Sequence, residues 1–212
     1  MHLDPNRLIN IVINGNSAAP VAGIIAQKVE GKLFVHDEVY IMTSGNPLDA
    51  ADAIADKYGG KEYRAQFDMV PDWRDGKANH TDGIATYNRL NPHFLGLQDM
   101  SYYAGLDHRE VDSINSLLAL FSCTKDNCRL FISDRCKSLL RDLDQCVYMP
   151  GTRKVSREDK ALYHVSSCLQ ILALRMFPVQ RLDPTKPPER KRSDLGEIFY
   201  AQRMKNQYGE PL

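Results

Sequence analysis

The chain has 212 residues, of which 43% are hydrophobic and 25% are charged, the profile of a globular protein with one sizeable core. Lys and Arg number 27, as do Asp and Glu, so the formal net charge is zero. This balance argues against nucleic-acid binding through bulk charge, although a local basic patch remains compatible with it. No apolar run approaches the roughly 20 residues of a membrane span. The first residues show no signal-peptide pattern, so we expect a cytosolic protein with no membrane partner.

The sequence contains five cysteines, an odd number, and no CxxC pair. Without an export signal, free thiols are the expectation for such a set, and the spacing fits no zinc ribbon.

In the first third of the chain, apolar runs predict strands over residues 8–14, 20–29 and 32–42. The sequence EGK between the second and third runs is typical of a hairpin turn. A helix is predicted over Pro47 to Tyr58, because proline stands at its start and two glycines follow its end. A fourth strand is predicted over 62–70.

The next region, 73–106, is polar and irregular, with one short helix around 82–90. Periodic apolar positions predict helices over 109–121, 134–145 and 158–176, and a short strand over 130–132. Phe177-Pro178 ends the last helix. This order of elements predicts a single α/β domain with a mixed sheet flanked by helices.

Beyond the last helix the composition changes to prolines and basic residues. We therefore expect one domain over 1–180 and a basic, proline-containing tail over 181–212.

Six stretches carry a further pattern through their order along the chain. They are INGNSAAP (13–20), VHDEVYI (35–41), VPDWRDG (70–76), REVDSINSLLALF (109–121), NCRLFISDRCKSLLRDL (127–143) and LYHVSSCLQILALRMFP (162–178). Together they resemble the nuclease domain of phage large terminases over roughly residues 8–178, and the stretch at 127–143 is the most specific. The resemblance implies an RNase H-like fold and a role in cutting and packaging viral DNA.

The resemblance also implies three carboxylates that hold Mg²⁺ or Mn²⁺. Their positions fall on Asn14, Asp72 and Ser167, so only Asp72 keeps the carboxylate, while His164 matches a histidine of the family. A neutral amide or hydroxyl is a much poorer ligand for these cations than a carboxylate. We therefore expect a pseudo-nuclease that has lost most or all of its cleavage activity.

Such a protein would act by binding DNA or packaging proteins, such as the motor ATPase or the portal, in the host cytoplasm or on the virion. The chain has no Walker A motif, so the motor is not part of it. Arg153, Lys154 and Arg157 precede the last helix and are candidates for phosphate contacts, with a solvated charged turn as the alternative.

Two other functions stay open. The first is an active metal-dependent endonuclease with a rebuilt site, in which Asp72 is joined by Glu38, Asp68 or Asp75. Glu38 enters because it follows Asp37 in a strand, where neighbouring side chains point to opposite faces and one of the two can face the site. The second is a protein-interaction module that reuses the fold away from DNA, which salt-independent binding would distinguish.

Overall fold

Six strands form one mixed sheet in the order β5-β4-β1-β2-β3-β6 in the computed structural model, which describes residues 2–15, 20–60, 62–70, 80–99, 110–121, 127–145 and 163–178. The strands are β1 (Ile9–Asn14), β2 (Val21–Val29), β3 (Lys32–Ile41), β4 (Arg64–Met69), β5 (Gly96–Asp99) and β6 (Leu130–Ile132). The first three pair antiparallel, whereas β4 joins β1, β5 joins β4 and β6 joins β3 in parallel.

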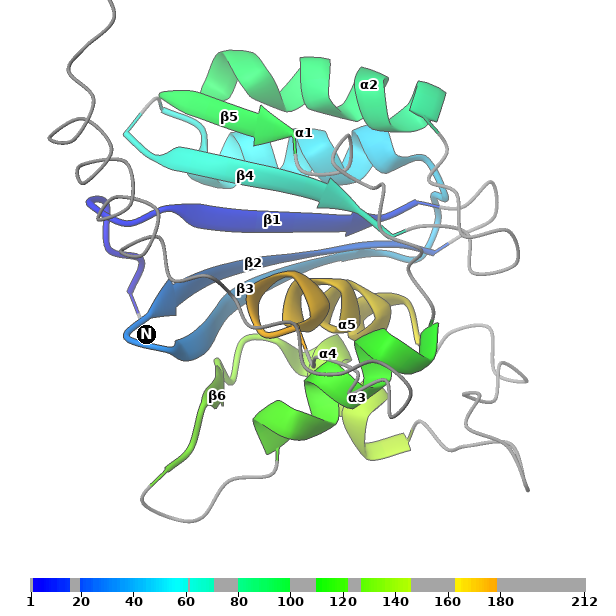
Figure 1. Cartoon of the computed structure of the whole chain (residues 1–212). Helices are drawn as coiled ribbons and strands as arrows, with labels where there is room; N and C mark the ends of the chain where they lie inside the picture. The colour runs from blue at the N-terminus through cyan, green and yellow to red at the C-terminus, as the bar shows by residue number, and fades with distance from the viewer. Residues whose placement is uncertain are drawn as a thin grey trace, which may run out of the picture. The chain divides into compact units, whose positions relative to one another are not determined.

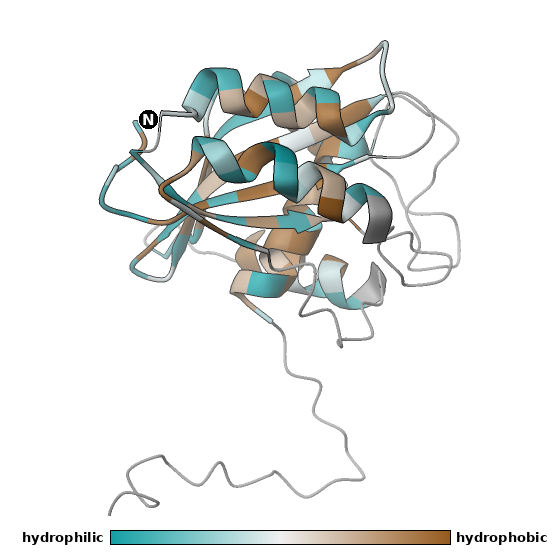
Figure 2. Ribbon diagram, turned by 90° about the horizontal axis from the view of Figure 1, so that it is seen from above, coloured by the Kyte–Doolittle hydropathy of each residue, from teal (hydrophilic) through white to brown (hydrophobic). Residues whose placement is uncertain are grey.

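Helices cover both faces of this sheet (Figure 1). They are α1 (Pro47–Tyr58), α2 (His80–Leu90), α3 (Glu110–Phe121), α4 (Lys137–Gln145) and α5 (His164–Met176), with a short 3-10 turn η1 (Asn91–His93). Helices α1 and α2 lie on one face, and α3, α4 and α5 lie on the other. Hydrophobic and hydrophilic segments alternate along the helices, as expected when one side of each packs on the sheet (Figure 2).

Each face of the sheet has its own hydrophobic core, because side chains alternate along the strands. In β1, Ile9, Ile11 and Ile13 pack toward α1, whereas Val12 packs toward α5. Asn14 has the same parity as Val12, so it also points toward α5. The alternation of side chains along β1 therefore decides that Asn14, at the end of the strand, faces the helical layer that contains α5.

The local signals predicted for the hairpin and for α1 are present. Glu30 and Gly31 adopt φ values of 49° and 76°, the left-handed pair of a tight two-residue hairpin turn. The side chain of Asn46 accepts a hydrogen bond from the backbone N–H of Leu48, and Pro47 opens α1. The predicted mixed α/β fold is confirmed.

One strand was not predicted, and two helices begin clearly later than predicted. Strand β5 was not predicted, because it is a four-residue edge strand whose pairing comes from β4 rather than from its own sequence. Helix α4 begins at Lys137 instead of 134, since a turn in which Cys136 N–H bonds the carbonyl of Ser133 precedes it. Helix α5 begins at His164, because Tyr163 has a φ of 83° and cannot continue a right-handed helix.

All described residues belong to one compact unit, Met1–Val179, and the predicted tail over 181–212 lies outside the described residues. Among the helices in the described ranges, none has both the length and the apolar character needed to cross a bilayer. Three cysteines fall within these ranges: Cys136 and Cys168 are buried free thiols, and Cys128 is half-buried.

Candidate functional site

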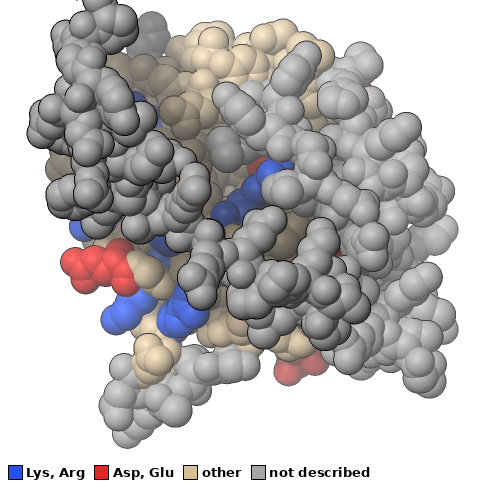
Figure 3. Space-filling view, in the orientation of Figure 1, with Lys and Arg blue, Asp and Glu red and all other residues tan. Residues whose placement is uncertain are grey.

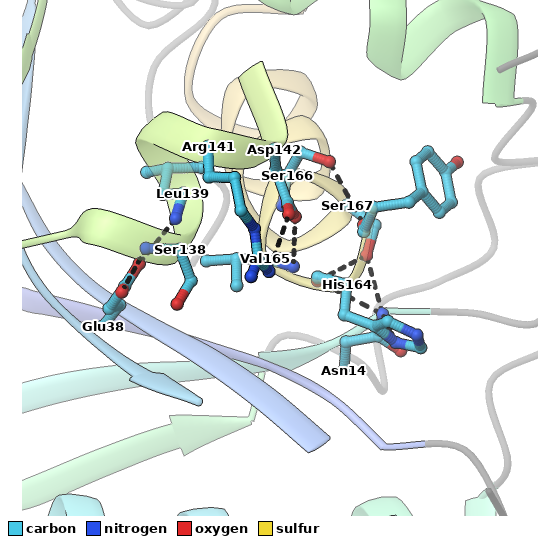
Figure 4. Close-up of polar contacts among 11 residues, drawn as sticks. Asn14, Glu38, Ser138, Leu139, Arg141, Asp142, His164, Val165, Ser166 and Ser167 are labelled. Atoms are coloured by element: carbon cyan, nitrogen blue, oxygen red, sulfur yellow. Dashed lines mark hydrogen bonds and ion pairs between the residues drawn. The ribbon is translucent and has the colours of Figure 1, made fainter. Parts of the chain in front are cut away.

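The end of β1 meets the first turn of α5, and this contact joins Asn14, His164 and Ser167 (Figure 4). The side-chain nitrogen of Asn14 lies 2.8 Å from Ser167 Oγ and 3.2 Å from the backbone carbonyl of His164. The same nitrogen lies 3.4 Å from His164 Nδ1. Asn14 is 4% exposed and Ser167 is fully buried. The fold therefore brings together two of the three positions at which the sequence resemblance expects metal ligands.

The neighbours determine which way the Asn14 amide points. The Ser167 hydroxyl donates its one hydrogen to the carbonyl of His164 at 2.8 Å, so toward Asn14 it can only accept. The His164 carbonyl is also only an acceptor. The amide NH₂ of Asn14 must therefore face this pair, because its carbonyl oxygen would meet two acceptors. A group that presents N–H hydrogens cannot coordinate a cation from that side.

Glu38 lies on the same face of the sheet, but its carboxylate is directed at α4. Its two oxygens accept hydrogen bonds from the backbone N–H groups of Ser138 and Leu139, each at 2.7 Å. In register, Asn14 pairs with Ala22, while Glu38 pairs with Ile24 on the next strand over. Two strand spacings and two residues separate the backbones, roughly 10 Å across and 7 Å along the sheet. Glu38 as a metal ligand stays a prediction, and in this arrangement it holds a helix.

A second carboxylate, Asp142 on α4, binds the start of α5 in the same way. Its Oδ2 accepts from the backbone N–H groups of Val165 at 3.1 Å and Ser166 at 3.2 Å, and the residue is fully buried. Burial raises the pKa of the Asp142 carboxyl above its usual range, and the two N–H bonds offset this only in part. The Arg141 guanidinium lies 3.7 Å from the other oxygen.

Asp68 of β4 also faces α5, and it is neutralised there. Its register partner is Val12, two residues before Asn14 on the neighbouring strand. Arg175 Nε lies 2.7 Å from Asp68 Oδ2, and both side chains are nearly buried, at 10% and 7% exposed. Asp37, by contrast, points to the opposite face, where Lys57 and Tyr58 of α1 contact its carboxylate.

The described residues do not fit a divalent-metal centre. Asn14 presents N–H groups, Glu38 binds backbone amides and Asp68 pairs with an arginine. Within the described ranges, no three His, Cys, Asp or Glu side chains lie close enough together to hold a metal ion. The remaining predicted site residues lie outside the described residues: Asp72, Asp75, Arg153, Lys154 and Arg157. Their roles stay predictions.

A group of basic and aromatic side chains lies at the end of the sheet opposite to Asn14. Lys28 lies near the end of β2, Lys32 begins β3 and Arg129 precedes β6. Lys28 and Arg129 lie over the ring of Phe177, at 4.5 and 4.9 Å from its centroid. Figure 3 shows Lys and Arg atoms gathered at the lower left, over the end of the sheet where the β2–β3 turn lies in Figure 1. This end carries these basic side chains beside the exposed Glu30 of the β2–β3 turn, away from the Asn14 site.

Two residues of this layer were missed by sequence reasoning, Asp142 and Arg175. For Asp142 a signal existed: it lies three residues after Leu139 and one before Leu143, on the buried side of an amphipathic helix. An acidic residue at a core position needs a partner, which here is the start of α5. For Arg175 no local signal pointed to Asp68.

No protein-family model matches the sequence, and no curated protein matches it. Solved structures do match. The large terminase of a thermophilic bacteriophage superposes with a TM-score of 0.60 at 10% identity, over 82% of this chain and 40% of that chain. The nuclease domain of the P22 large terminase superposes with a TM-score of 0.57 at 11% identity, over 88% of this chain and 90% of that one.

The chain thus spans two fifths of the terminase from the thermophilic phage and nearly the whole P22 nuclease domain. At these identities the similarity concerns the fold. The predicted resemblance to the nuclease domain of large terminases is therefore confirmed as a resemblance of fold, RNase H-like in type, and the activity depends on the site.

Proposed function

We propose that this chain is a terminase-type nuclease domain that serves viral DNA packaging by binding DNA or packaging proteins, with cleavage lost or strongly impaired. The fold supports a packaging role, and one observation carries the loss of cleavage. At the end of β1, an amide donates hydrogen bonds to Ser167 and His164 where the family's arrangement calls for two carboxylates around a cation. Such a role corresponds to the host cytoplasm or the virion.

Plasmid cleavage tests the loss of activity directly. Supercoiled plasmid is incubated with the protein and Mg²⁺ or Mn²⁺, with EDTA and an Asp72→Ala variant in parallel. We expect no metal-dependent nicking above the level of the variant, because the described face supplies no set of anionic ligands. Nicking by the parent that disappears in Asp72→Ala would overturn the proposal and establish the active endonuclease with a rebuilt site.

A double reversion tests the cause of the loss. If the neutral groups at the two positions abolish cleavage, Asn14→Asp/Ser167→Asp should gain Mn²⁺-dependent nicking that each single variant lacks, since one added carboxylate leaves the ligand set incomplete. A folded double variant with no nicking would show that impairment has another origin.

DNA binding is tested by its dependence on salt concentration and on two matched sets of basic side chains. We expect binding of duplex DNA at low salt with an affinity that falls steeply as salt rises. Replacing Arg153, Lys154 and Arg157 by Ala should lower the slope of log K against log salt by up to about 3, one for each lost phosphate contact. The control replaces Lys28, Lys32 and Arg129 by Ala, an equal loss of charge at the end of the sheet that carries the β2–β3 turn.

Equal weakening by both triple variants would mean that only net charge matters. No binding of DNA at low salt and no capture of a portal or motor protein would contradict the proposal. Salt-insensitive binding of a protein outside the packaging machinery would favour the interaction module instead.

A further inference from the structure

Helices α4 and α5 both begin without a capping side chain of their own. The residues that precede them are Cys136 and Tyr163, neither of which belongs to the Ser, Thr, Asp and Asn group that caps helices. The Tyr163 side chain makes no capping hydrogen bond to α5, and the residue enters the helix in the left-handed conformation, with φ of 83°. For a residue with a side chain this conformation is strained, and it persists only where the surroundings hold it.

Carboxylates from elsewhere in the fold take the place of these missing caps (Figure 4). Glu38 binds the second and third N–H groups of α4, and Asp142 binds the second and third N–H groups of α5. These are the groups that an N-cap side chain satisfies, and a negative charge there also complements the helix dipole.

The two contacts follow one another in space. Glu38 of β3 holds the first turn of α4, and Asp142 lies on the next turn of that helix, about 4.5 Å along its axis from Leu139. Asp142 in turn holds the first turn of α5, which carries His164 and Ser167 to Asn14 on β1. Both carboxylate contacts and the Asn14 contact lie on the same face of the sheet.

We propose that Glu38 and Asp142 form a carboxylate relay that sets the position of His164 and Ser167 relative to Asn14. The left-handed conformation of Tyr163 needs support from its surroundings, and the two backbone N–H bonds to Asp142 supply that support at the first turn of α5. Glu38 acts one step earlier: it fixes the first turn of α4, and the position of α4 determines the position of Asp142. Both are positioning residues, and the relay acts whether the site cuts DNA or only binds a partner.

The test follows the side-chain NH₂ resonance of Asn14 in the full-length ¹⁵N-labelled protein, because neither relay carboxylate touches Asn14. Asp142→Ala should shift this resonance and speed hydrogen exchange of the Val165 and Ser166 amides by about tenfold, the loss of one ordinary hydrogen bond. Asp142→Asn keeps an acceptor oxygen and should return both readouts most of the way to the parent.

Glu38→Ala is the decisive variant. It should speed exchange at Ser138 and Leu139 and also shift the Asn14 resonance, and Glu38→Gln should reverse both changes. In the double variant Glu38→Ala/Asp142→Ala, the Asn14 shift should not exceed that of Asp142→Ala alone, because the later step is already cut. Asp52→Ala is the control, since its carboxylate pairs with Arg89 on the surface of the other helical layer.

Two results would overturn the relay: an unchanged Asn14 resonance in folded Asp142→Ala, or a Glu38→Ala effect confined to α4. If Asp142→Ala does not fold, the Glu38 pair decides alone. A shift of Asn14 that Glu38→Gln reverses supports the relay, and no shift refutes it.

Discussion

At the scale of single residues, position 14 is built for a hydrogen-bond donor. The Ser167 hydroxyl and the His164 carbonyl both present acceptor lone pairs to it from the first turn of α5. A carboxylate in the same place would face those lone pairs with a negative charge and no hydrogen to share. The substitution is therefore more than the loss of a ligand, because the surrounding polar groups now complement the amide.

Asn14→Asp should destabilise the protein in a pH-dependent way. The folded state favours the protonated acid, which can donate, so the pKa of the new carboxyl is raised on folding. The variant should be closest to the parent at acid pH and lose stability as pH rises above the unfolded value of about 3.9. Above the folded pKa we expect a loss of about 2 kcal/mol in the free energy of unfolding, measured by urea denaturation from pH 3 to 8.

Asn14→Ala serves as the reference for that experiment. It removes the donor without adding a charge, so its cost should vary little with pH relative to the parent. A pH profile of Asn14→Asp parallel to that of Asn14→Ala would refute the argument about amide orientation.

At the scale of elements, α5 is the helix on which the site depends. Residues Val165 to Ala173 are almost entirely buried, and polar contacts hold both ends of the helix. Asp142 and Asn14 hold the first turn, and the ion pair of Arg175 with Asp68 ties the last turns to β4. Because both partners of that pair are nearly buried, removing one leaves the other charged and poorly solvated.

Arg175→Met should therefore cost about 3 kcal/mol in the free energy of unfolding, and Asp68→Asn a similar amount. The double variant should cost clearly less than the sum, since no uncompensated charge remains. Urea denaturation of the four proteins gives the coupling free energy. The exposed pair of Asp52 with Arg89 is the matched control, where the same cycle should give little coupling. Additive costs at Asp68 and Arg175 would contradict the inference that the buried pair is coupled.

At the scale of the whole molecule, the two cores on the two faces of the sheet draw on described residues no later than Phe177. The boundary predicted from composition falls a few residues later, at 180. Among the residues that the structure describes, the apolar side chains of both cores thus lie before the predicted tail.

A chain truncated after residue 180 should melt within about 2 °C of the full-length protein, because about 1 kcal/mol corresponds to 2–4 °C at this size. Scanning calorimetry measures the difference. As a control, truncation after residue 170 removes the buried Ile171, Leu172 and Ala173 and should abolish cooperative unfolding. A drop of more than about 5 °C on removing only 181–212 would show that the tail packs on the domain.

Sequence reasoning located most elements because their signals are local. The apolar run of β1 and the Pro47 start of α1 lie within a few residues of the structure they determine. It failed where the cause is remote. Strand β5 forms because it pairs with β4. The start of α5 depends on the left-handed conformation of Tyr163, which the neighbouring sequence does not predict.

The sequence by itself determined the α/β fold class and the absence of a carboxylate at positions 14 and 167. Tertiary structure alone decided which groups meet. Asn14 reaches Ser167 across 153 residues, Glu38 reaches Ser138 across 100, and Asp68 reaches Arg175 across 107. Propensity and periodicity act over a few residues, whereas these hydrogen bonds form only after the sheet has ordered its strands and the helices have packed on it.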